Sequence, residues 1–517
     1  MRTTRTTLTG KTAKTAKTTK TTKTTKSTRT RRALPAALAL AAAVVLGSGC
    51  AALSPAGRGD APAAMPPALP AAWQAPVPAA SATASATIAN HDVWWQRFND
   101  PLLPALVASA QAASPTLAIA AARIERARAS RVAAGAALLP AVGVVGSASS
   151  GRVSPEPRIT TTNASAGVQA SWEIDLFGGN AAGRTAAQAR LEGARAAQAG
   201  ARTAVAAETA STYLALRACE AQRVQTGIDA TSRAETARLT AESERAGFTA
   251  PADAALVRAS AAQARTQLAS QRQACDTLIK SLVELTALEE PALRQRLAAA
   301  TAVVPQPQAV PMQALPAALL AQRPDLVEAG RAVVAAASDI RQSQAQELPQ
   351  ISLSGQVAGV AVRSGNSGTS SGATWSFGPL SVNFPLFDGG ARAAATGAAR
   401  AGYDEAVAQY QAQVRGAVRE VEVSLVALQS TAEREADALS AAQDFEASLR
   451  ATQARQRGGL ASLFDLETAR RNAIVAQSAL IDLRRERAAA WITLYRALGG
   501  GWDAAALEAH TVAVARP

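Results

Sequence analysis

The sequence predicts a mainly α-helical protein with a smaller membrane β part, built from two copies of one structural unit. The first observation is a near repetition, because EIDLFGG at residues 173–179 returns as NFPLFDGG at residues 383–390. The second is composition: aromatic residues make up only 4% of the 517 residues, and such an alanine-rich chain favours long, closely packed helices. The third is that residues 158–250 and 386–516 contain no proline, which permits uninterrupted helices there.

The repetition covers most of the chain with a slowly drifting offset. SPTL at residues 114–117 matches RPDL at residues 323–326, an offset of 209, whereas Gly247 and Gly459 match at an offset of 212. Such drift indicates two copies of one unit. Each copy is expected to hold a short helical stretch, a turn proline, two strands, a long helix, a glycine turn and another helix. The predicted segments are repeat 1 at 91–300, a proline-rich linker at 301–313, repeat 2 at 314–503 and a C-terminal tail at 504–517.

Residues 391–457 give the clearest helical pattern, because their apolar residues step by threes and fours as in a coiled-coil seam. A continuous helix of this length spans about 100 Å at 1.5 Å per residue. Residues 181–246 predict a comparable rod, whose glycines weaken it or mark close approach of another backbone. The seam residues are Val407, Tyr410, Val414, Val418, Val421, Leu425 and Leu428, and the glycines are Gly183, Gly193, Gly200 and Gly227.

The predicted strands alternate apolar and polar residues, as suits lipid on one face and water on the other. ISLSGQV at residues 351–357 is the clearest example, and WSFGPLSVNFPLF changes face around Gly378 and Pro379. In the first copy, residues 141–151 and 163–172 are the predicted strands. Four strands are too few to close a barrel around a channel, so their edges must be satisfied by other chains.

The formal charge of +14 is concentrated at the N-terminus. Residues 1–32 hold 11 of the 53 Lys and Arg and no acidic residue, which leaves 42 basic and 39 acidic residues elsewhere. An apolar run at residues 33–46, too short for a typical membrane span, then leads through small residues to Cys50. We therefore predict a signal peptide at residues 1–49 and no nucleic-acid partner. A basic DNA-binding protein remains the alternative if that segment is retained.

Cys50 resembles the acylated cysteine of bacterial lipoproteins. Residues 50–90 are rich in Pro, Ala and Ser, so they predict a lipid-anchored, flexible tether. In an oxidising compartment the two other cysteines, Cys219 and Cys275, are candidates for a disulfide. Each lies 28 residues from Gly247, so an antiparallel helical hairpin about that glycine brings the two sulfur atoms level. The alternative is two buried thiols on unrelated helix faces.

Taken together, the motifs resemble the outer membrane efflux protein family of the TolC, OprM and NodT type, in its lipoprotein branch. The motifs, in chain order, are WWQRFNDPLL, LLPAV, SWEIDLFGG, LPAALLAQRPDL, ELPQISLSG, NFPLFDGG, GLASLFDLETAR and LYRALGGGW, and they cover residues 92–503. The resemblance implies a homotrimer in the outer membrane, with a twelve-stranded barrel and an α-helical periplasmic tunnel. It also implies that glycine in LFGG and LFDGG turns each strand into a helix.

The function implied by this resemblance is passive export of drugs or other small molecules. An inner-membrane transporter, of the RND type, would supply energy, and a periplasmic adaptor would couple it to this channel. The alternatives are an outer-membrane conduit for type I protein secretion and a periplasmic coiled-coil scaffold that does not conduct. The sequence identifies neither the exported substrate nor the particular pump.

The resemblance also assigns a periplasmic gate to Asp253 and Asp465, and the adaptor contact to the hairpin tips at Gly247 and Gly459. Threefold symmetry would bring three copies of each aspartate near the axis, where repulsion and focusing favour cations. The alternative is that each aspartate caps its helix, because Asp is common in a first helical turn. No catalytic, metal or cofactor site is predicted, since histidines are few and the cysteines lack metal-site spacing.

Overall fold

A computed structural model describes residues 73–75, 91–152, 159–307, 320, 322–365 and 368–500. The chain divides into two compact units, Met1–Ala63 and Ala64–Pro517, and all of these residues belong to the second. The predicted signal peptide and Cys50 lie outside the described residues, as do residues 308–313 of the predicted linker.

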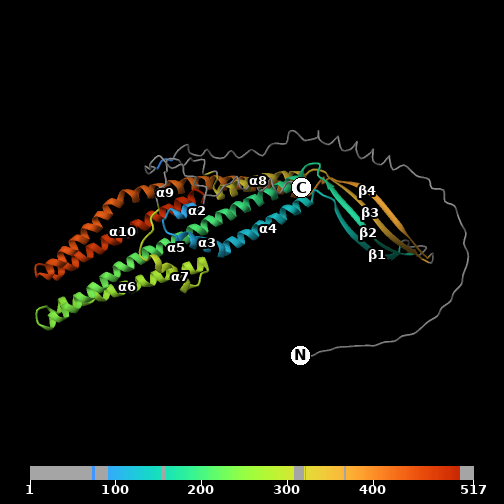
Figure 1. Ribbon diagram of the computed structural model, residues 1–517. Coiled ribbons are helices and arrows are strands. Elements are labelled where there is room, and N and C mark those ends of the chain that lie inside the picture. Colours follow the sequence, from blue (N-terminus) through green and yellow to red (C-terminus); the bar gives the residue numbers. More distant parts are fainter. Residues whose placement is uncertain are drawn as a thin grey trace, which may run out of the picture. The chain divides into compact units, whose positions relative to one another are not determined.

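Repeat 1 begins with three helices, α2 (His91–Gln96), α3 (Leu102–Ala113) and α4 (Pro115–Ala136). Strands β1 (Ala141–Arg152) and β2 (Thr160–Ile174) follow. Next come the long helix α5 (Gly179–Arg245), its partner α6 (Pro251–Thr286), the short α7 (Glu290–Leu297) and a 3₁₀ turn, η1 (Ala298–Ala300). Figure 1 shows α5 and α6 as the arms of one helical hairpin.

Repeat 2 has the order of elements that runs from α4 to α6 in repeat 1. It runs from α8 (Pro324–Gln346) through β3 (Gln350–Ser364) and β4 (Thr369–Asn383) to α9 (Ala391–Arg457) and α10 (Leu463–Ala497). Helices α5 and α9 both contain 67 residues, so each is about 100 Å long. The predicted helix at 391–457 is thus confirmed, as is the recurrence of one unit.

Glycine makes the turn from strand to helix in both repeats. Gly178 precedes α5 with φ of 73°, and Gly390 precedes α9 with φ of 88°. This left-handed region favours glycine because a Cβ atom is crowded there. The LFGG and LFDGG motifs therefore have the role that the resemblance implied.

The helices pack side by side through small residues. Helix α8 lies against both α5 and α9, and α10 lies against both α9 and α5. A methyl group on Gly179 would lie only 2.9 Å from Cβ of Ala345 in α8, and one on Gly183 would lie 3.0 Å from Nε2 of Gln342. These glycines therefore permit the close approach of α5 and α8, and Gly183 is one of the glycines at which the sequence suggested a close approach.

The principal hydrophobic core joins the beginning and the end of the folded chain. The rings of Trp94 and Trp95 in α2 lie 5.3 and 4.8 Å from the ring of Tyr495 in α10. Trp94 also lies 6.0 Å from Trp491. Four seam residues of α9, including Val421 and Leu425, are buried in the same cluster. The seam predicted in α9 is therefore the face that packs inward.

Three residues of the predicted tether are held against α9. The backbone N–H groups of Gln74 and Ala75 donate to the two carboxylate oxygens of Glu422, at 2.8 and 2.7 Å. Ala75 is buried, and Trp73 packs against the principal core. The tether is thus attached at this point, because a carboxylate that accepts two N–H bonds makes a charge-assisted clamp.

Cys219 in α5 and Cys275 in α6 form a disulfide, with their Cα atoms 5.6 Å apart. The bridge lies about midway along the hairpin, where Gln271 Nε2 also donates to the carbonyl of Cys219 at 3.2 Å. The hairpin about Gly247 therefore brings the two sulfur atoms level, as the symmetric spacing suggested.

We predict that Cys219→Ser with Cys275→Ser lowers the free energy of unfolding by about 3–4 kcal/mol, as expected for the loop that this bridge closes. Chemical denaturation of the detergent-solubilised protein measures the change. Reducing agent should destabilise the wild type and leave the double variant unaffected. The bridge is contradicted if the intact mass of the wild type fails to rise on reduction by two hydrogen atoms.

Candidate functional site

The four strands form one antiparallel sheet in the order β1-β2-β3-β4. The register places Val144, Val168, Val357 and Trp375 in line across it. Because successive side chains alternate between faces, this line defines an apolar face. Its large apolar residues are Val142, Val144, Val168, Trp172, Ile174, Ile351, Leu353, Val357, Trp375, Phe377, Leu380 and Val382.

The opposite face is polar. Gln169 in β2, Gln356 in β3 and Ser376 in β4 lie in line on it. Ser147 and Ser165 are also paired on this face, with their hydroxyl oxygens 2.8 Å apart. The separation of apolar and polar residues is typical of strands with lipid on one side and water on the other.

A β-bulge keeps the apolar face of β4 continuous. Leu353 pairs with Leu380 but Gly355 pairs with Phe377, so β4 has one extra residue at Gly378 and Pro379. Residues 375–377 and 380–382 alternate in opposite phase, and the bulge brings both parts to the same face. The change of face predicted there is confirmed.

The apolar face is uncovered in the single chain. Trp375 and Phe377 are 77% and 81% exposed, and Leu380 and Val382 are 61% and 63% exposed. Soluble monomers rarely expose a contiguous apolar area of this size. The face therefore requires an apolar environment, which the hydrocarbon core of a membrane supplies.

The sheet also has two open edges. Strand β1 pairs only with β2, and β4 pairs only with β3, within the described sheet. An unpaired strand edge is not stable in hydrocarbon. Each N–H or C=O group without a hydrogen-bond partner there costs on the order of several kcal/mol. Further strands must therefore pair with β1 and β4.

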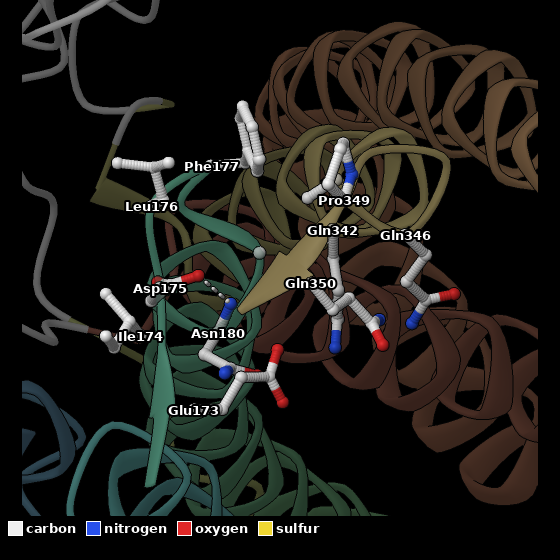
Figure 2. A pocket seen from close by; sticks show the side chains of 12 residues that line it. Glu173, Ile174, Asp175, Leu176, Phe177, Asn180, Gln342, Gln346, Pro349 and Gln350 are labelled. Carbon is white, nitrogen blue, oxygen red and sulfur yellow. Dashed lines mark hydrogen bonds between the residues drawn. The ribbon is translucent and has the colours of Figure 1, made fainter. Parts of the chain in front are cut away.

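A pocket of 160 Å³ lies where the sheet meets the helices, between the end of β2, the start of α5 and the end of α8. Figure 2 shows Glu173 and Gln350 beside it, with Gln342 and Gln346 on the α8 side. Asp175 caps α5, since its carboxylate accepts from the backbone N–H groups of Asn180 at 3.1 Å and Ala181 at 2.8 Å.

The two hairpin tips have the same construction. Gly247 and Gly459 have φ of 80° and 73°. The N–H of Phe248 bonds to the carbonyl of Ser243 at 2.9 Å, and the N–H of Leu460 bonds equivalently to that of Arg455 at 2.8 Å. These glycines end the long helices in Schellman motifs. Phe248, Leu460 and also Phe464 are largely exposed, which leaves apolar side chains at both tips.

Contacts near the tips hold the two hairpins together. The guanidinium of Arg470 in α10 is buried and donates to the hydroxyl of Thr236 in α5 at 3.4 Å. Arg470 also pairs with Glu467 at 2.5 Å. Because Arg470 is five residues from Asp465, the second hairpin meets the first close to its tip.

Asp465 forms a capping box at the start of α10. Its carboxylate accepts from the N–H of Ser462 at 2.9 Å, and the Ser462 hydroxyl accepts from the N–H of Asp465 at 3.1 Å. Hydrogen bonds from Ser462 lower the pKa of Asp465. This cap contributes stability above the ordinary aspartate pKa of about 3.9, and the contribution is lost as pH falls through the lower folded-state value.

Asp253 differs from Asp465, although both lie in the first turn of a helix. It belongs to the first turn of α6, whose N-cap residue Ala250 makes no side-chain capping bond. The carboxylate of Asp253 is exposed and has no hydrogen bond or ion pair within the described chain. The capping interpretation thus describes Asp465 in this protein, and Asp253 is available for another role.

Two buried polar clusters were not found from the sequence. Arg217 in α5 donates to the Tyr213 hydroxyl at 3.0 Å and to Glu220 at 2.8 Å. Burial, together with a bond to Asp100, raises the pKa of Tyr213. Arg323 precedes α8 and joins Glu420 of α9, at 2.9 Å, to the C-terminal carbonyl of α10. For the cluster around Arg323, the one signal in the sequence was the acid that follows the proline in RPDL.

Comparison with known proteins identifies the family. A profile described as Outer membrane efflux protein matches residues 106–288 and 315–500. The chain belongs to this family. It is 30% identical over 451 residues to the probable efflux pump outer membrane protein TtgC of Pseudomonas putida, covering 84% of this chain and 91% of TtgC.

Two solved channels have the same fold. The outer-membrane channel OprN matches with a TM-score of 0.73 and 25% identity, over 85% of this chain and 99% of OprN. VceC of Vibrio cholerae matches with a TM-score of 0.69 and 25% identity, over 80% and 100%. This family member is therefore an outer-membrane component of an efflux system, and its relatives are transport proteins rather than enzymes.

Among the described helices, none is by itself long and apolar enough to cross a membrane, while α3 and α4 together, bent by 47°, meet that length and composition.

We predict that Phe377→Arg impairs insertion of this efflux protein, because an arginine on the lipid-facing side of a membrane strand costs up to about 2–4 kcal/mol. Denaturant titration of folding into liposomes measures the loss. The matched control is Ser376→Arg, one residue away on the polar face of β4, which should fold nearly as well as the wild type. Equal losses in both variants would mean that the two faces are wrongly assigned.

Proposed function

We propose that three copies of this chain form one outer-membrane channel that passively conducts drugs or other small molecules. The open, two-faced sheet supports this function most strongly. Three copies of four strands make a twelve-stranded barrel with no free edge, whose apolar faces meet lipid and whose polar faces line water. The long helices of the three copies then form a periplasmic tunnel about 100 Å long.

We propose that this channel performs export together with partners that supply the energy. We assign energy input to an inner-membrane transporter of the RND type and coupling to a periplasmic adaptor. The adaptor contacts the hairpin tips at Gly247 and Gly459, where the exposed side chains of Phe248, Leu460 and Phe464 offer an apolar surface. Acylated Cys50 anchors the chain to the outer membrane, and Glu422 holds the tether that follows it.

Planar-bilayer recording tests the channel directly. Purified mature protein should give steady conductance steps that require no energy source. Opening and closing of the channel should not depend on an added transporter. Phe377→Arg serves as the negative control, since it impairs insertion without altering the tunnel. If wild-type protein inserts into liposomes yet never conducts, the scaffold alternative is correct and the proposed channel is not.

We further propose that Asp253 and Asp465 restrict the periplasmic entrance. Both lie one turn or two beyond a tip glycine, so threefold symmetry places two sets of carboxylates near the axis. Arg455 adds a positive charge that lowers the pKa of Asp465 further, after the hydrogen bonds from Ser462. Mutual repulsion among the carboxylates, offset by such cations, is a balance that an adaptor can shift.

We expect Asp253→Asn and Asp465→Asn each to raise conductance or antibiotic leak roughly twofold or more, because removal of the charges relaxes the entrance. Ser462→Ala is the matched control, since it weakens the capping box but keeps the charge of Asp465. Leak that rises equally in Ser462→Ala and Asp465→Asn would show that the cap, and not a gate, explains Asp465.

A further inference from the structure

Glu173 is the only charged side chain on the polar face of the described sheet. It lies near the end of β2, where the register pairs it with Ser352 of β3. The remaining polar-face positions are Ser, Thr, Asn, Gln, Gly, Ala and Val. A single acid on an otherwise neutral wall stands out, because a carboxylate adds nothing to the solubility of a face that is already polar.

We propose that Glu173 forms a site for organic cations, namely ammonium and guanidinium groups, at the helix end of the barrel. The proposal rests on the threefold channel of the previous subsection and adds the charge class that its neck favours. The proposed site lies at the opposite end of α5 from Asp253, so it does not depend on the roles assigned to the hairpin tips.

The pocket beside Glu173 has the composition that a cation requires. Its 12 lining residues include two acids and no Lys, Arg or His. Gln342, Gln346 and Gln350 border it in Figure 2, and their carboxamide oxygens are acceptors for N–H donors. The volume of 160 Å³ admits an amine head group but not a large molecule.

The carboxylate of Glu173 is free to bind, whereas the other acid of the pocket is not. Both carboxylate oxygens of Asp175 accept hydrogen bonds, from the backbone N–H groups of Asn180 and Ala181. Glu173 is exposed and makes no hydrogen bond or ion pair within the described residues. Asp175 also neutralises the positive end of α5, which would otherwise attract an anion to the same pocket.

In the trimer, three copies of Glu173 surround the axis where the barrel meets the helices. Walls of low dielectric concentrate the field of fixed charges in such a cleft and raise the local concentration of counter-ions. With neutral residues at the other described positions of the polar face, these three carboxylates determine the charge preference of this section. Cations would therefore dwell at the neck and anions would be depleted there.

The test is the reversal potential of purified channels in a planar bilayer under a potassium chloride gradient. Wild type should be cation-selective, and Glu173→Gln should lower the potassium-to-chloride permeability ratio by about twofold or more. Guanidinium ion, which is small and carries N–H donors, should reduce wild-type current at concentrations that leave Glu173→Gln unaffected. Glu173→Asp keeps the charge and should retain both properties.

Glu284→Gln is the matched control, because Glu284 is an exposed acid of α6, outside the sheet. It should leave selectivity and block unchanged. A Glu173→Gln channel that conducts with wild-type selectivity and wild-type block would overturn the cation site while leaving the channel intact. If Glu173→Gln fails to assemble, Glu173→Lys replaces it in the test. Loss of block in Glu173→Lys would support the cation site, and unaltered block would overturn it. Absence of conductance in wild type would instead overturn the proposed channel itself.

Discussion

Pairing of backbone hydrogen-bonding groups at the edges of the four-stranded sheet is the constraint on which the rest of this protein depends. Each open edge carries N–H and C=O groups that hydrocarbon cannot satisfy. The strand order β1-β2-β3-β4 places the two open edges at opposite sides. In the proposed trimer, β4 of one copy therefore meets β1 of the next, and three such heterologous contacts close a ring.

The same constraint explains why helices of this length are attached to so small a sheet. Strands β2 and β4 lead into α5 and α9 through left-handed glycines, so the proposed ring of strands would arrange the helices around the same axis. Glycines such as Gly179 then let α8 approach α5 closely. The Cys219–Cys275 bridge and the clamp at Glu422 add local restraint to elements that small side chains alone hold weakly.

Local sequence signals predicted much of this fold because they reflect local physics. Absence of proline and a regular seam located α9 at its observed bounds, and the change of alternation located the change of face at Gly378. Strand β2 begins at Thr160, earlier than predicted, because its first residues are polar and show no alternation. Helix α7 was also missed, since eight residues give too little periodicity.

The candidate sites were less predictable, because they depend on contacts between distant segments. The charge of Glu422 gave no sign that residues 74 and 75 would bind it from almost 350 positions away. Arg323 similarly meets Glu420 only after the chain folds. Asp253 and Asp465 occupy equivalent positions in the sequence, yet only Asp465 has a serine placed to complete a capping box. Glu173 became noticeable only when the register showed a neutral face around it.

The mass of the purified mature protein, measured by light scattering with the detergent contribution subtracted, tests the central claim most directly. Edge pairing between copies predicts a complex of three chains in detergent, and the same three chains when they are cross-linked in lipid vesicles. A protein that remains a single chain in both environments would contradict the account, because its sheet edges would then have to be satisfied without another copy.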